Sequence, residues 1–320
     1  MHNIEADDRH DTFTSHAFAE QLVDLGDVRL NYATTGGAEL PALLLVPGQS
    51  ESWWGYEQAM PLLAEHFQVY AVDLRGQGRS SWTPGRYTLD IWGNDLVRFI
   101  DLVIGRPAVV SGNSSGGILA AWLAAYGKPG QVRGAVLEDA PVFASEVRPA
   151  CGQSISQSIG PMFAMWNKWL GDQWSIGDWK GMQAAAPKEL PGWMLAALKG
   201  MGFGDADGEA GPPRNLREYD PEWARVFWTG TAGASCDHVR MLSSIRTPVL
   251  FTHHFRMIDG GTGALMGAVS DQQAARARDL VTAAGQPFEY ASFPEMGHSM
   301  HRLAPELFTK TIVDWSSTLA

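Results

Sequence analysis

The chain has few cysteines, few basic residues and no long apolar run. Cys151 and Cys236 are the only cysteines in 320 residues, which excludes a disulfide framework and is typical of a reducing compartment. Lysine and arginine number 24 against 35 acidic residues, and the formal charge is -11. Binding to phosphates needs clustered basic side chains, so this balance argues against a nucleic-acid partner. The longest apolar run, Ile118 to Tyr126, is too short to cross a bilayer, and we expect no membrane association.

The N-terminal residues 1–15 are polar and acidic, without the basic start and apolar stretch of a signal peptide. We therefore expect a flexible tail there and a cytoplasmic protein. Hydrophobic residues make up 45% of the chain and charged residues 18%, which is ordinary for a globular protein. The length is sufficient for a core domain with a subdomain.

Short apolar runs alternate with amphipathic segments along most of the chain. Glu20–Leu25 and Asp27–Thr35 predict a hairpin around Gly26. Further strands are expected at Ala42–Pro47, Phe67–Asp73, Pro107–Ser111, Val132–Glu138, Pro248–His253 and Phe288–Phe293. Helices are expected at Trp54–His66, Leu89–Ile104, Ser115–Tyr126, Asp271–Ala284 and Ala304–Trp315. Apolar strands separated by helices predict an α/β fold with a mostly parallel, doubly wound sheet covered on both faces.

One region, residues 142–241, lacks this alternation. It contains 7 of the 13 tryptophans and 6 of the 12 methionines, and glycine and proline interrupt it often. Short helices and loops are the expectation. We interpret the region as a helical lid, or cap, inserted into a core formed by residues 16–141 and 242–320. Most of its aromatic side chains are expected to pack the lid onto the core.

The sharpest motif is Gly112-Asn113-Ser114-Ser115-Gly116, between an expected strand and an expected helix. A G-x-S-x-G sequence at such a turn holds its central residue in a strained conformation, with the hydroxyl above the sheet. The spacing selects Ser114 over Ser115 as a nucleophile. A serine hydroxyl needs a base to take its proton.

The base is expected in a loop after the last strand, where His298 follows Gly297, with His301 as the alternative. The acid is less certain from the residues alone. After the next-to-last strand the chain offers only Asp259, whereas the strand that follows the nucleophile helix ends in the adjacent pair Glu138 and Asp139. We prefer this pair because the acid must orient the imidazole from a fixed strand end.

The oxyanion of an acyl-transfer reaction needs two backbone N–H donors. Ser115, directly after the nucleophile, is expected to supply one and Gln49, after an early strand, the other. His238, His253 and His254 do not have the spacing of a zinc site. The sequence therefore predicts neither a metal nor a cofactor.

Three segments carry a resemblance to a known family: the G-x-S-x-G turn around Ser114, AVDLRGQGRS and EMGHSMH. The chain resembles the α/β-hydrolase family over nearly its whole length. Within that family it is most similar to the lactone hydrolases that open the macrocyclic mycotoxin zearalenone. The segments that carry this likeness are VPGQSESWWGYE, GNSSGG, LEDAP, DQWSIGDWKG and DPEWAR. Most of the wider family has His-Gly at the position of Pro47-Gly48. At this position the chain is more similar to the lactonases than to the wider family.

The resemblance implies that Asp139, two residues before Pro141, is the acid, and that the lid residue Trp223 contacts the substrate. Further substrate contacts are expected in the matched segments, at Gly48, Trp54, Pro141, Trp174 and Trp179. Many such enzymes are homodimers, so a homodimer is an expectation that the resemblance adds.

The expected activity is hydrolysis of an apolar ester or lactone, such as zearalenone, through Ser114, His298 and Asp139. A general carboxylesterase, a C–C bond hydrolase and a cofactor-free haloperoxidase are the rival enzymes, and a ligand receptor is the non-enzymatic rival. Dehalogenases and epoxide hydrolases are disfavoured because their nucleophile is aspartate.

Overall fold

The computed structural model describes residues 16–171, 177–200 and 214–319 of the chain. The expected tail at residues 1–15 and the proposed contact residue Trp174 lie outside these ranges.

The centre of the molecule is an eight-stranded sheet with the order β1-β2-β4-β3-β5-β6-β7-β10. The first strands pair antiparallel (β1 with β2, β2 with β4), and all the other pairs are parallel. The predicted doubly wound α/β fold is therefore confirmed. The strands are β1 Glu20–Asp24, β2 Arg29–Thr35, β3 Ala42–Val46, β4 Gln68–Val72, β5 Ala108–Asn113, β6 Val132–Glu138, β7 Val249–His253 and β10 Phe288–Ser292.

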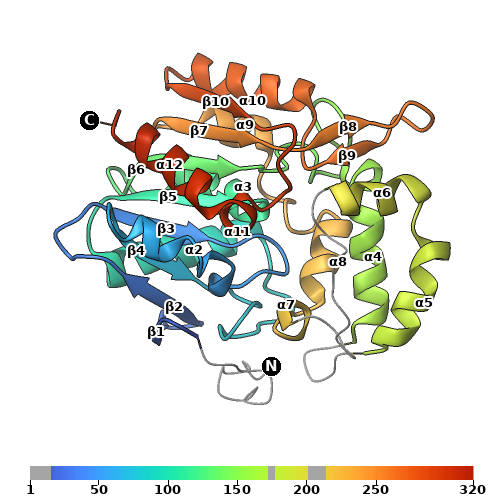
Figure 1. Cartoon of the computed structure of the whole chain (residues 1–320), viewed down its shortest axis with the longest axis horizontal. Coiled ribbons are helices and arrows are strands. Elements are labelled where there is room, and N and C mark those ends of the chain that lie inside the picture. Colours follow the sequence, from blue (N-terminus) through green and yellow to red (C-terminus); the bar gives the residue numbers. More distant parts are fainter. Residues whose placement is uncertain (1–15, 172–176, 201–213, 320) are drawn as a thin grey trace.

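Helices cover both faces of this sheet (Figure 1). One face packs against α2 Leu89–Phe99, with its π-helical extension η3 Ile100–Ile104, α3 Ser115–Tyr126, α9 His238–Ser243 and α10 Asp271–Ala283. The other face packs against η2 Trp53–Tyr56, α1 Met60–Leu63, α11 Met300–Leu303 and α12 Pro305–Ser316. Successive side chains of β3 alternate between the two layers: Leu43 and Leu45 face the second, Leu44 and Val46 the first.

The predicted helix at 54–66 is wrong as a single element. The structure has η2 there, then a break, then the one-turn helix α1. Pro61 has no N–H to donate to the carbonyl of Glu57, so a helix can contain it only in its first turn and must restart at Met60.

A short antiparallel hairpin, β8 Arg256–Ile258 with β9 Leu265–Gly267, was not expected from the sequence. Its strands are three residues long, too short for alternation to reveal them. It follows β7 and projects from the sheet toward α6, which β9 contacts (Figure 1).

Between β6 and α9 the described residues form helices and loops. These are η4 Ile155–Gln157, α4 Gly160–Trp169, α5 Trp179–Glu189, α6 Gly192–Gly200, α7 Arg214–Arg217 and α8 Glu222–Trp228. Helices α4, α5, α6 and α8 stand together at one side of the sheet (Figure 1). Because α9 packs on α3 and α10, the core resumes at α9, and we call residues 142–237 the cap.

Candidate active site

Ser114 lies at a sharp turn between β5 and α3. Its backbone has φ 55° and ψ -122°, a conformation that side chains rarely adopt. The flanking glycines permit this turn: a Cβ on Gly112 would lie 2.0 Å from the carbonyl oxygen of Gly116, and one on Gly116 would lie 2.3 Å from that of Val46. The spacing of the motif thus has a steric cause, and it aims Ser114 away from the sheet.

His298 follows β10 in a loop, and its Nδ1 lies 2.7 Å from Oδ2 of Asp139, at the end of β6. The second carboxylate oxygen of Asp139 accepts the backbone N–H of His254 at 3.1 Å. Burial alone would raise the pKa of Asp139, but His254 and the bonded His298 outweigh it and hold that pKa below its ordinary value. Asp139 is therefore ionised. Burial alone would lower the pKa of His298. The hydrogen bond and charge of Asp139 outweigh burial, together with the charges of Glu51 and Glu138, so the pKa of His298 is raised above its ordinary value.

Two residues that were not predicted to belong to the site form hydrogen bonds to the backbone of the loop that contains His298. His254 lies at the end of β7, and its Nδ1 is 3.0 Å from the carbonyl oxygen of Gly297 and 3.2 Å from that of His298. Only an Nδ1–H can bond both oxygens, and Nε2 lies within hydrogen-bond distance, 3.0 Å, of the hydroxyl oxygen of Thr252. Asn113, the residue before the nucleophile, donates to the His298 carbonyl at 3.0 Å. The adjacent His253-His254 pair at a parallel strand end was the available sequence signal.

The structure places the alternative acids elsewhere. Glu138 accepts from Nδ1 of His301 at 2.9 Å, and its carboxylate does not reach His298. His301, the alternative base, is fully buried in this pair. Asp259 lies at the tip of the β8–β9 hairpin, where it accepts the N–H and hydroxyl of Thr262. Of the three carboxylates, only Asp139 contacts the ring of His298.

Gln49 and Ser115 line the same cavity as Ser114. Ser115 is the first residue of α3, so its N–H has no acceptor within the helix. A Cβ on Gly48 would lie only 3.0 Å from the Cβ of Ser114, which shows how closely this loop approaches the nucleophile. The Gln49 side chain donates to the hydroxyl of Tyr219 in the cap at 2.6 Å. The two residues predicted as oxyanion donors therefore lie beside the nucleophile.

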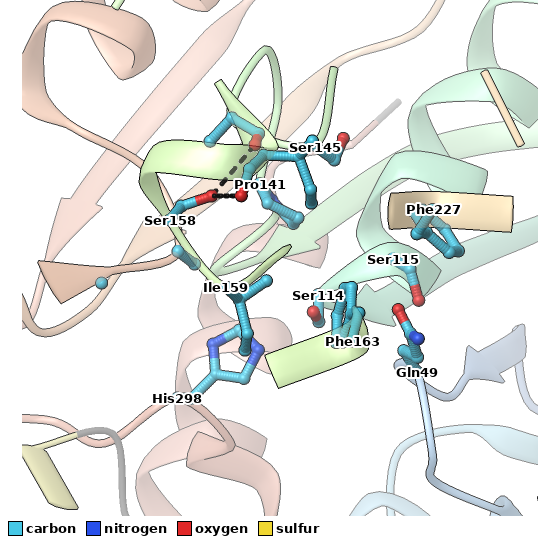
Figure 2. A pocket seen from close by; sticks show the side chains of 14 residues that line it. Gln49, Ser114, Ser115, Pro141, Ser145, Ser158, Ile159, Phe163, Phe227 and His298 are labelled. Carbon is cyan, nitrogen blue, oxygen red and sulfur yellow. Dashed lines mark hydrogen bonds between the residues drawn. The ribbon is translucent and has the colours of Figure 1, made fainter. Parts of the chain in front are cut away.

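Ser114 and His298 line one cavity between the core and the cap. Figure 2 shows Ser114, Ser115, Gln49 and His298 around it, with Phe163 and Ile159 of the cap close to the nucleophile. The wall combines the polar groups near Ser114 with a mainly apolar lining from the cap and from the residues after β9. Its members are Gln49, Ser114, Ser115, Pro141, Ala144, Ser145, Ile155, Ser158, Ile159, Phe163, Phe227, Gly267, Ala268 and His298.

Among the expected substrate contacts, Pro141 lines the cavity and Gly48 touches the nucleophile. Trp223 differs from the expectation: it is fully buried, its ring is tilted by 31° against that of Trp92 with centroids 3.9 Å apart, and it is not among the residues that line the cavity. Its indole N–H donates to the carbonyl oxygen of Arg75 at 2.8 Å, so it fastens the cap to the core. One turn further along α8, Phe227 is the aromatic residue that reaches the cavity.

Trp54 and Trp179 do not line the cavity either. Trp54 donates to Glu218 at 3.1 Å, and Trp179 packs at the start of α5 against the core cluster. Within residues 16–171, 177–200 and 214–319, no three histidine, cysteine, aspartate or glutamate side chains gather as metal ligands would. No helix of the same ranges is both long and apolar enough to span a membrane.

Comparison with known proteins places the chain among hydrolases. It is 34% identical over 100 residues to 3-oxoadipate enol-lactonase 2 of Acinetobacter baylyi, covering 31% of this chain and 38% of that protein. It is 35% identical over 121 residues to bifunctional epoxide hydrolase 2 of Sus scrofa, covering 37% of this chain and 21% of that protein. The chain thus aligns with well under half the length of these relatives.

Solved structures of similar fold cover nearly the whole chain. The enol-lactonase from Burkholderia xenovorans LB400 superposes with a TM-score of 0.62 at 17% identity, over 93% of this chain and 100% of that one. A hydrolase from Pseudomonas aeruginosa PA01 gives a TM-score of 0.61 at 21% identity, over 95% and 100%. The sequence profile of the alpha/beta hydrolase family matches residues 43–311. With its fold, its serine elbow and this match, the chain belongs to the alpha/beta hydrolase family.

Proposed function

We propose that the protein hydrolyses carboxylic esters and lactones through an acyl-enzyme on Ser114. One observation carries this proposal: Ser114 and His298 line the same cavity, and His298 is held at 2.7 Å by the ionised Asp139. Asp139 keeps the proton of the resting imidazole on Nδ1, so that Nε2 is the nitrogen that accepts the serine proton. The raised pKa of His298 makes it a better proton acceptor in that step.

Attack of the Ser114 oxygen on the ester carbonyl forms a tetrahedral intermediate. The backbone N–H groups of Gln49 and Ser115 stabilise its oxyanion. His298 then returns the proton to the departing alkoxide, which in a lactone stays attached to the acyl group as the far end of the opened ring. Water, deprotonated by the same imidazole, hydrolyses the acyl-enzyme and releases the acid.

The cavity lining supports a bulky, uncharged substrate. Ile155, Ile159, Phe163 and Phe227 provide apolar area on the cap side, while the polar groups concentrate around Ser114. The similarity to enol-lactonases supports a cyclic ester, and the resemblance to zearalenone lactonases supports an aromatic macrolactone. Zearalenone is accordingly the substrate that we propose.

Incubation with zearalenone, a small lactone and a nitrophenyl ester, followed by product mass, tests the proposal. We expect each lactone to give a ring-opened acid heavier by one water and the nitrophenyl ester to give its acid and nitrophenol, with zearalenone giving the highest kcat/KM. The Ser114→Ala variant should lose on the order of 10⁴ in kcat, whereas Ser145→Ala, a cavity serine outside the chemistry, serves as the matched control. If none of the three substrates is hydrolysed in a reaction that requires Ser114, the proposal is refuted.

A further inference from the structure

A second carboxylate–imidazole pair is buried beside the first. Glu138 and Asp139 are neighbours at the end of β6, and His298 and His301 lie three residues apart. Asp139 binds His298, and Glu138 binds His301 through Nδ1 at 2.9 Å and also accepts its backbone N–H at 3.1 Å. Glu138 and His301 are both fully buried. The proposed acyl-transfer mechanism does not use this second pair.

His301 connects Glu138 to a third carboxylate, Glu51. Nε2 of His301 lies 3.5 Å from Oε2 of Glu51, and the Tyr56 ring lies against the imidazole with centroids 4.2 Å apart. Glu51 is only 7% exposed. Its other oxygen accepts from the Ser299 hydroxyl at 3.2 Å and from Arg302 at 3.3 Å. Since Ser299 directly follows His298, Glu51 ties the loop after β3 to the loop of the catalytic histidine.

Glu51 also faces the reacting groups. With Ser114, His298 and Asn113 it lines a second space of about 320 Å³ that adjoins the main cavity beside Phe163. The residue before it, Ser50, is buried with φ 61°. A serine in this left-handed conformation is strained.

We propose that Glu51 is a positioning residue whose negative charge stabilises the protonated form of His298 during acyl transfer, and that the Glu138–His301 pair holds Glu51 in place. This inference rests on the proposed function of Ser114 and His298. During attack His298 becomes an imidazolium in a site nearly closed to water, where a neighbouring fixed charge acts strongly. Glu51 would supply that charge without contacting the substrate.

The charges around the two histidines agree with this role. His298 is faced by Asp139, Glu51 and Glu138, and by His254 at the end of β7. His301 is faced by Glu138, Glu51, Tyr56 and Arg302. Burial would raise the pKa of Glu51, but His301 and Arg302 overcome it and lower that pKa to about 2. Burial would lower the pKa of His301, but Glu138 and Glu51 raise it to about 9. At neutral pH, Glu51 is therefore anionic and His301 cationic.

The test measures the pKa of His298 directly by NMR titration of the imidazole in Ser114→Ala protein, with the signal assigned by its loss in a His298→Asn variant. Glu51→Gln removes the negative charge and should lower the His298 pKa by about one. Glu51→Asp keeps the charge and should restore most of the change. His301→Gln removes a positive charge and should not lower the His298 pKa. Glu306→Gln, an exposed carboxylate on α12, is the matched control.

In protein that retains Ser114, the acidic limb of the kcat/KM profile should move to lower pH in Glu51→Gln, and kcat on the plateau should fall about tenfold. A Glu51→Gln variant that loses activity while the His298 pKa stays unchanged would overturn the inference, because the residue would then only support the loop. If Glu51→Gln does not fold, the His301→Gln titration decides, because a His298 pKa that falls when this positive charge is removed would overturn the inference. Failure of the proposed function would appear separately, as wild-type protein without Ser114-dependent hydrolysis, and the titration would still test Glu51.

Discussion

Replacing Asp139 by asparagine exchanges one carboxylate oxygen for an NH₂ group and should prevent His298 from acting as the proposed base. The carboxylate of Asp139 accepts two N–H groups, Nδ1–H of His298 at 2.7 Å and the backbone N–H of His254 at 3.1 Å. An asparagine has one acceptor oxygen. If that oxygen still accepts the backbone N–H of His254, the NH₂ group of the asparagine faces Nδ1 of His298. Nδ1 must then be unprotonated, because it has to accept a hydrogen bond from this group. The imidazole carries its proton on Nε2 and cannot accept one from Ser114.

The expected loss in kcat/KM is about 10³ to 10⁴, equivalent to about 4 to 5.5 kcal/mol of transition-state stabilisation. Initial rates on a nitrophenyl ester and on zearalenone give this number, and thermal unfolding checks that the variant is folded. Glu138→Gln should lose about tenfold or less, because that carboxylate acts on His298 only at a distance. Asp259→Asn, on the exposed hairpin, should retain full activity. A larger loss in Glu138→Gln than in Asp139→Asn would refute this assignment.

Three further predictions concern the surroundings of the site. Ser115→Ala should retain most activity, since only its backbone N–H is used, and a large loss of kcat would place its hydroxyl in the chemistry. Trp223→Ala should lower the free energy of unfolding by about 3 to 5 kcal/mol in urea titrations, with equal effects on large and small substrates; Phe227→Ala should instead change their ratio of kcat/KM. The pKa of His301 rises on folding from 6.5 to about 9, so its stabilisation is complete below pH 6.5 and is lost as the pH rises through 9. That loss is on the order of 3 kcal/mol in unfolding free energy, and His301→Gln should flatten the slope between these values.

The parts of the site that the sequence predicted are those set by backbone sterics. Gly112 and Gly116 are required wherever a serine occupies the turn with φ 55°, because any Cβ there would meet a carbonyl group. The grouping of the strand ends could also be predicted from the sequence, because parallel apolar strands bring their carboxyl ends to one edge of the sheet. Asp139 was harder to assign. Its own φ of 45° turns the chain at the end of β6, so strand alternation no longer determines where its side chain points.

Side-chain orientation within the cap could not be predicted. The sequence places Trp223 and Phe227 one turn apart on a helix, and both rings contact Trp92, but only the folded structure shows that Trp223 is enclosed in the core while Phe227 also lines the cavity. Glu51 was missed for a similar reason. Its partners Ser299, His301 and Arg302 lie about 250 residues further along the chain, and no local pattern connects them.

The close indole pair of Trp92 and Trp223 gives the molecule an optical probe of its own. One belongs to α2 of the core and the other to α8 of the cap, their ring centroids are 3.9 Å apart, and both N–H groups donate to the carbonyl oxygen of Arg75. Two indole chromophores this close couple their electronic transitions, and the resulting circular-dichroism couplet disappears when the rings separate. Subtracting the spectrum of a Trp223→Phe variant isolates this couplet from the other tryptophans. Stopped-flow spectroscopy of this couplet therefore tests, in unlabelled protein, whether the two rings separate during turnover.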